Sequence, residues 1–175
     1  MTRIVFSAIA LACVASACTS DTASSPSSQP KPTFSALLKT SNENPPITGA
    51  EATGAGNSTM TFDVTRDSSG NIMAAQVTFV VNLSGFPPGT PIRIAHIHTG
   101  VASVNGAVVI DTGLTPGDGL TLADGSGSFT RTATVASTSF GIVNQILANP
   151  SAFYFNAHTL VNGGGVVRGH LDRVQ

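Results

Sequence analysis

The chain has 175 residues, of which 10% are charged and 41% apolar, and its formal net charge is -1. Eight basic residues against nine acidic ones create no field that would attract nucleic acid, so we expect no nucleic-acid partner. The apolar fraction is too high for a disordered chain. After the N-terminus, no apolar stretch approaches the roughly 20 residues that span a bilayer. We therefore expect one globular domain preceded by a short extra segment.

Residues 1–17 are typical of a bacterial lipoprotein signal peptide. Arg3 precedes an apolar run that is too short for a stop-transfer helix, and small residues stand directly before Cys18, as in a lipobox. Two alternatives remain: cleavage at Cys13, which leaves a shorter apolar region, and an ordinary signal peptide with incidental cysteines. We predict lipidation at Cys18, so that acyl chains hold the protein on a membrane of the bacterial cell envelope, outside the cytoplasm.

Residues 18–33 comprise the lipidated cysteine and a tether rich in Ser, Thr and Pro, without apolar periodicity. Both cysteines of the chain precede residue 19, so the domain expected over 34–175 has no disulfide, although it would lie in an oxidising compartment. Its stability must then come from core burial or from a bound metal.

From Phe34 onward, short stretches with apolar residues at period two alternate with clusters of Gly, Asn, Asp, Ser and Pro, a pattern typical of antiparallel β structure. The clearest hairpin joins residues 59–65 to residues 75–83 through the turn at 67–71. Further strands are expected at residues 34–38, 92–98, 108–111, 128–135, 152–159 and 166–172. The sequence thus predicts an all-β fold, an antiparallel Greek-key β-sandwich of about eight strands.

One short helix is expected near residues 139–149. Phe140, Val143, Ile146 and Leu147 have helical spacing, good N-cap residue types precede them, and Asn149-Pro150 ends the pattern. We expect this helix to cover one end of the sandwich.

Three histidines are candidate metal ligands. His96 and His98 stand at i and i+2 in a predicted strand, so their side chains share one face, and His158 comes from another predicted strand. Three neutral imidazoles would suit copper, with zinc as the alternative, and leave one coordination position open. The competing interpretation is that these histidines form ordinary hydrogen bonds.

Four further polar residues are expected around this site. Asn156 shares a strand face with His158, and Arg168 shares one with His170. Arg168 is alternatively a surface cation or the partner of a carboxylate such as Glu43. The sequence contains no Gly-X-Ser-X-Gly motif, no phosphate loop and no cysteine nucleophile within the domain, so ordinary hydrolase and transferase chemistry is disfavoured and we assign no catalytic residue.

Five sequence blocks, in order, resemble the CHRD domain, a family named for chordin and widespread in bacterial secreted proteins. The blocks are Phe34–Leu37, Asn42–Pro46, Ala95–Gly100, Phe155–Thr159 and Gly164–Leu171. The resemblance covers about residues 34–173 and implies a secreted β-sandwich domain without an assigned biochemical activity. Family members usually carry Glu where Val166 stands here, which questions any salt bridge from that position to Arg168.

A more distant likeness is to copper/zinc superoxide dismutases, which are Greek-key sandwiches with a His-X-His strand, a later copper histidine and a C-terminal arginine that steers anions. His96, His98, His158 and Arg168 follow that order, but the zinc loop and the cysteine pair are missing. Three functions follow as hypotheses: a non-catalytic metal-binding module, a structural or protein-interaction domain without metal, and a dismutase-like copper oxidoreductase.

Overall fold

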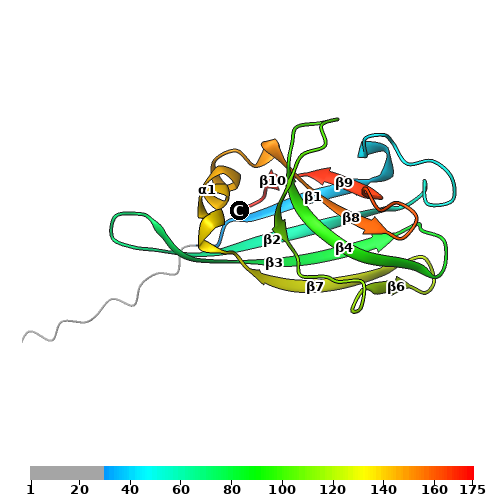
Figure 1. The fold of residues 1–175 in the computed structure, drawn as a ribbon, viewed down its shortest axis with the longest axis horizontal. Helices are drawn as coiled ribbons and strands as arrows, with labels where there is room; N and C mark the ends of the chain where they lie inside the picture. Colours follow the sequence, from blue (N-terminus) through cyan, green and yellow to red (C-terminus); the bar gives the residue numbers. More distant parts are fainter. Residues whose placement is uncertain (1–29) are drawn as a thin grey trace, which may run out of the picture.

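Ten antiparallel strands form a single sheet that curls into an almost closed barrel in the computed structural model, which describes residues 30–175 (Figure 1). The predicted signal peptide, Cys18 and most of the predicted tether lie outside the described residues. In chain order the strands are β1 (Thr33–Lys39), β2 (Ala55–Arg66), β3 (Ile72–Ser84), β4 (Thr90–Thr99), β5 (Val108–Asp111), β6 (Leu120–Leu122), β7 (Gly127–Thr134), β8 (Phe153–Thr159), β9 (Val167–His170) and β10 (Asp172–Arg173).

The spatial order of the sheet is β5-β4-β8-β9-β1-β2-β3-β7, with β6 paired to β4 and β10 paired to β1. The prediction of an all-β antiparallel fold is confirmed, and so is the hairpin, which joins β2 to β3. The pairing of Lys39 with Arg168 links β1 to β9, so the two halves of the barrel belong to one continuous sheet. The short strands β6 and β10 raise the number of strands above the eight expected.

The interior of the barrel holds the hydrophobic core, which alternate residues of the strands fill. Phe34, Phe62, Phe79 and Phe155 are all fully buried, and the rings of Phe34 and Phe62 meet edge to face with centroids 5.5 Å apart. These large side chains contribute to the apolar burial that stabilises a barrel without disulfides.

The predicted helix is confirmed as α1 (Phe140–Ala148), which lies at one end of the barrel (Figure 1). Val143 and Ile146 are its buried residues, and they attach it to the core. The expected N-cap bond is missing: Ser139 makes no side-chain cap, and a 3-10 turn over Ser137–Ser139 leads into the helix instead. Within residues 30–175, no helix is long and apolar enough to cross a membrane.

A β-bulge in β4 decides which face of the sheet carries the histidines. Opposite β8, Ile92 pairs with Thr159 and Ile94 pairs with His158, so Arg93 is an extra residue in β4. Strict alternation from the buried Ile92 would send His96 and His98 into the core. The extra residue shifts the phase, so that Ala95 and Ile97 point inward and both histidines point outward.

Candidate metal centre

Three histidines from two neighbouring strands meet on the outer face of the barrel wall. His96 and His98 come from β4 and His158 from β8, and each offers a ring nitrogen that lies within 4.8 Å of the other two. His96 Nδ1 and His158 Nε2 are 3.2 Å apart. Imidazoles bound to one tetrahedral ion at about 2.0–2.1 Å would place their nitrogens about 3.3 Å apart, so this pair already has the required separation.

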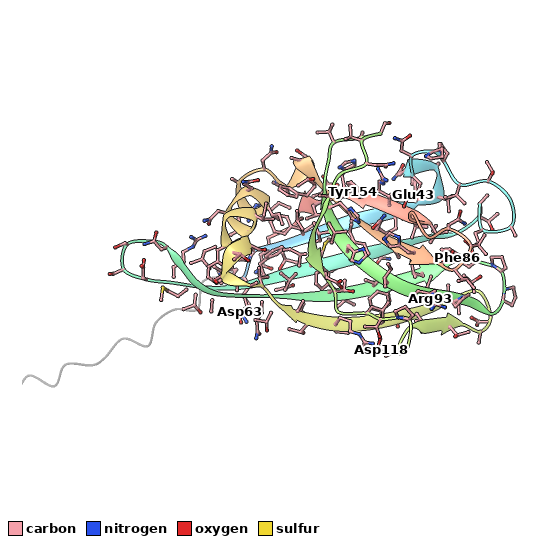
Figure 2. All side chains as sticks on the ribbon, viewed as in Figure 1. Glu43, Asp63, Phe86, Arg93, Asp118 and Tyr154 are labelled. Carbon is pink, nitrogen blue, oxygen red and sulfur yellow. The ribbon has the colours of Figure 1, made fainter. Side chains whose placement is uncertain are left out.

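Loops cover this outer face, so the site is buried although it lies outside the barrel. All seven residues of β8 are buried, including Tyr154, Asn156 and His158, which point away from the core. Loops that follow β1, β4 and β8 contact the outward side chains: Glu43 pairs with Arg168, Gly106 accepts from His98, and Gly163 accepts from His158. Figure 2 shows Tyr154 and Glu43 on the same side of the barrel, beside the loop that follows β4.

Each histidine directs its second ring nitrogen to an acceptor outside the cluster. His98 Nδ1 donates to the carbonyl oxygen of Gly106, and His158 Nδ1 donates to that of Gly163, both at 3.0 Å. His96 Nε2 lies 3.6 Å from an Asp111 carboxylate oxygen, a separation too long for a hydrogen bond but close enough to favour a proton on that nitrogen. With the protons on these outer nitrogens, the lone pairs of His96 Nδ1, His98 Nε2 and His158 Nε2 face the cluster, where Asn156 Oδ1 also lies 3.0 Å from His158 Nε2.

Burial favours the neutral form of the three imidazoles. Desolvation lowers the pKa of His158 to about 4, and it also lowers the pKa values of His96 and His98. Asp111 opposes this effect at His96, and the Gly106 carbonyl opposes it at His98. Neutral imidazoles are the form that binds metal ions. His98 Nε2 is buried and has no hydrogen-bond partner among residues 30–175.

Asn156 joins the cluster to the neighbouring ion pair. This residue of β8 is fully buried and stands between His96 on β4 and Arg168 on β9 in the register of the sheet. Its Oδ1 atom lies 3.0 Å from His158 Nε2. Its Nδ2 atom and Glu43 Oε1 flank Gly165, where a Cβ atom would stand only 2.6 Å and 2.7 Å from them. Glycine at position 165, with φ +131°, is therefore required for this close packing.

Arg168 and Glu43 form a buried ion pair beside the histidines. Arg168 Nη2 lies 2.9 Å from Glu43 Oε2, and Arg168 Nη1 and Nη2 also donate to the Val104 carbonyl oxygen and to Asn105 Oδ1. Burial raises the pKa of Glu43, and Arg168 acts in the opposite direction. The alternative in which Arg168 pairs with Glu43 is thus the one present. Arg168 therefore has a carboxylate partner although Val166, which is buried in the core, stands where family members usually carry Glu.

Tyr154 connects this ion pair to His98. The rings of His98 and Tyr154 stack with centroids 4.9 Å apart and planes inclined by 6°. The Arg168 guanidinium carbon lies 4.0 Å from the centroid of the Tyr154 ring, a cation-π contact. His170 lies outside the cluster: it pairs with Tyr154 across β8 and β9, and its Nδ1 donates to the Phe153 carbonyl oxygen at 3.2 Å.

Sequence reasoning missed two side chains of this site. Tyr154 precedes Asn156 by two residues and therefore shares its strand face, but an aromatic residue in an apolar strand is easily interpreted as core. Asp111 ends β5 directly opposite His96, a pairing that only the register of the sheet reveals.

The comparisons with known proteins identify the family. No curated protein and no solved structure matches the chain. The family model described as the CHRD domain matches residues 34–171, which include every strand from β1 to β9 apart from the first residue of β1. The resemblance that the five sequence blocks carry is confirmed, and the chain belongs to the CHRD domain family.

Proposed function

We propose that this CHRD domain is a non-catalytic metal-binding module in which His96, His98 and His158 are the ligands, with copper favoured over zinc. The module is a lipoprotein of the bacterial cell envelope, held to a membrane through Cys18 after removal of residues 1–17. Residues 18–33 give it distance from the bilayer. The support for the anchor is the order of signal, cysteine and tether in the sequence.

One observation carries the metal proposal: the lone pairs of the cluster converge without a proton between them. The carbonyls of Gly106 and Gly163 hold the protons of His98 and His158 on the outer nitrogens. His158 Nε2 then faces His96 Nδ1 at 3.2 Å, where two lone pairs would repel. A cation between the two nitrogens would remove that repulsion, because both lone pairs would coordinate it. Histidines that bind metals usually donate their other ring N–H to a carbonyl or carboxylate oxygen, as His98 and His158 do here.

The donor set favours copper over zinc. All three protein ligands are imidazole nitrogens, and affinities of such sites follow an order in which Cu²⁺ exceeds Zn²⁺. Three ligands leave an open position, which structural zinc sites do not have. Asn156 and Tyr154 then hold the ligands in place, because they contact His158 and His98, and Arg168 packs in turn on the Tyr154 ring.

A structural or interaction domain without metal is the second candidate, and the same 3.2 Å contact supports it. If His96 carries its proton on Nδ1, that nitrogen donates to His158 Nε2, and the cluster becomes a buried hydrogen-bond network that fixes the register of β4 and β8. Asp111 argues against this form, because its charge favours the proton on His96 Nε2.

A dismutase-like activity has less support. That hypothesis uses Arg168 to draw an anion to the open position, but Arg168 is only 2% exposed and its charge is already paired with Glu43. A buried, paired guanidinium adds little field at the surface.

Titration of the purified protein with Cu²⁺ and Zn²⁺ by calorimetry tests the proposal. We expect one equivalent of Cu²⁺ to bind tightly, Zn²⁺ to bind more weakly, and His98→Ala to lose most of the Cu²⁺ affinity. His170→Ala is the matched control, since it removes an imidazole outside the cluster, and it should bind Cu²⁺ like the wild type. Absence of binding tighter than about micromolar, or equal loss in both variants, would contradict the proposal.

A further inference from the structure

A small depression brings a second positive charge beside the candidate metal centre. The depression has a volume of about 220 Å³, and its lining includes Arg93 and Ile94 of β4 with His158 and Leu160 on the β8 side. This volume is below that of pockets that hold drug-sized ligands, so it suits a ligand of a few atoms.

The β-bulge of β4 puts Arg93 there. Arg93 is the extra residue between Ile92 and Ile94, whose partners on β8 are Thr159 and His158. Bulges re-aim side chains near functional sites, and this one gives Arg93 a place on the outer face next to His158. Figure 2 shows Arg93 near the start of β4, away from Tyr154 and from the loop that follows β4.

The charge of Arg93 is not used elsewhere in the described chain. Among residues 30–175, Arg93 takes part in none of the ion pairs, and it is the one permanently charged side chain that lines this depression. Asp118, which precedes the segment that pairs with the start of β4, is held 3.0 Å from Arg131. Glu51 contacts Thr159, but the same carboxylate oxygen already accepts from both Thr159 and Asn162.

Arg93 and Arg168 therefore differ in whether an external ligand can reach their charge. Arg168 is enclosed with its carboxylate, whereas Arg93 is half-buried at a surface depression that His158 also lines. A ligand in this depression would meet one guanidinium and no carboxylate among the lining residues. With a metal ion on the histidines, the positive potential increases further, and a small anion is the ligand that such a field selects.

The geometry points to a small-anion site at this depression, where Arg93 attracts an anion to the side of His158 and so towards a metal on His96, His98 and His158. This inference rests on the proposed metal site and names the class of ligand that the site accepts. It assigns to Arg93 the anion-attracting role that the likeness to superoxide dismutases implied for Arg168.

Azide tests this inference, because its coordination to Cu²⁺ produces a charge-transfer absorption band. The Cu²⁺-loaded protein is titrated with azide at low ionic strength. We expect Arg93→Gln to weaken azide binding by roughly fivefold, because the charge lies at a half-exposed position, and Arg93→Lys to retain most of the affinity. Added salt should weaken azide binding in the wild type more than in Arg93→Gln.

The control is Arg66→Gln, which removes one positive charge at the far end of β2, where Arg66 bonds to Gly70 and Asn144. Its azide affinity should equal that of the wild type. Equal azide affinity in Arg93→Gln and wild type, or no azide band on the copper protein, overturns the anion site and leaves the metal site standing. Failure of the wild type to bind Cu²⁺ overturns the proposed function itself. Arg93→Lys keeps the test valid if the Gln variant does not fold.

Discussion

Removal of the Glu43 carboxylate should destabilise the protein strongly, because it leaves the Arg168 charge buried without its counter-ion. The side chains of Arg168 and Glu43 are only 2% and 3% exposed, and their closest atoms are 2.9 Å apart. Breaking such a pair by removing one partner costs about 3–5 kcal/mol. Val104 and Asn105 still accept bonds from Arg168, so we expect Glu43→Gln to lie near the lower end, about 3 kcal/mol.

For a domain of this size, about 3 kcal/mol corresponds to a fall in melting temperature of roughly 10 °C, measured by calorimetry or circular dichroism. The double variant Glu43→Met/Arg168→Met removes both charges and should lose less stability than Glu43→Gln alone. Lys31→Ala is the control, because it breaks the exposed Lys31–Asp63 pair and should change little. A loss below about 1 kcal/mol for Glu43→Gln would refute the reasoning that the charge is buried and paired.

Three further predictions concern the histidines and the core. Burial lowers the pKa of His158 from 6.5 to about 4, so the unfolded chain takes up a proton at a higher pH than the folded protein does. The free energy of unfolding of the metal-free protein should therefore be full above pH 6.5 and fall by on the order of 3 kcal/mol towards pH 4. Denaturant titrations that show no such loss would contradict this prediction. Asp111→Asn should weaken Cu²⁺ binding by about tenfold in calorimetry, since it removes the charge behind His96; unchanged affinity would mean that Asp111 does not orient the ring. Ile146→Ala, on the buried face of α1, should cost about 2–5 kcal/mol in denaturant unfolding yet leave Cu²⁺ affinity unchanged; a loss of affinity would couple the helix to the site.

The sequence predicted the residues of the candidate site better than their surroundings. The i, i+2 spacing of His96 and His98 was enough to place both on one face of a strand, since that periodicity is local. Which face they occupy depends on the bulge at Arg93, which exists only because β4 pairs with β8 in a particular register. No local pattern in β4 alone could have shown that the histidines lie outside the barrel.

Contacts between segments far apart in the chain could not be predicted from local sequence patterns either. Glu43 and Arg168 are 125 residues apart, and their pairing could be offered only as one alternative for Arg168. The helix and the long hairpin could be predicted because each is determined by neighbours in the chain. β6 and β10 are too short for any periodicity to appear, and the continuity of the sheet follows from pairing between β1 and β9, which are far apart in the chain.

Thermal melts of the protein with EDTA, with Cu²⁺ and with Zn²⁺ test the central claim most directly, because they separate a metal site from a metal-free network. At a hundredfold excess over the dissociation constant, an ion that binds only the folded state adds about 2.7 kcal/mol, a rise of several degrees in melting temperature. We predict this rise for the wild type with Cu²⁺ and its loss in His96→Ala/His98→Ala. Equal melting temperatures of the wild type in all three conditions would contradict the metal site and leave a structural or partner-binding barrel.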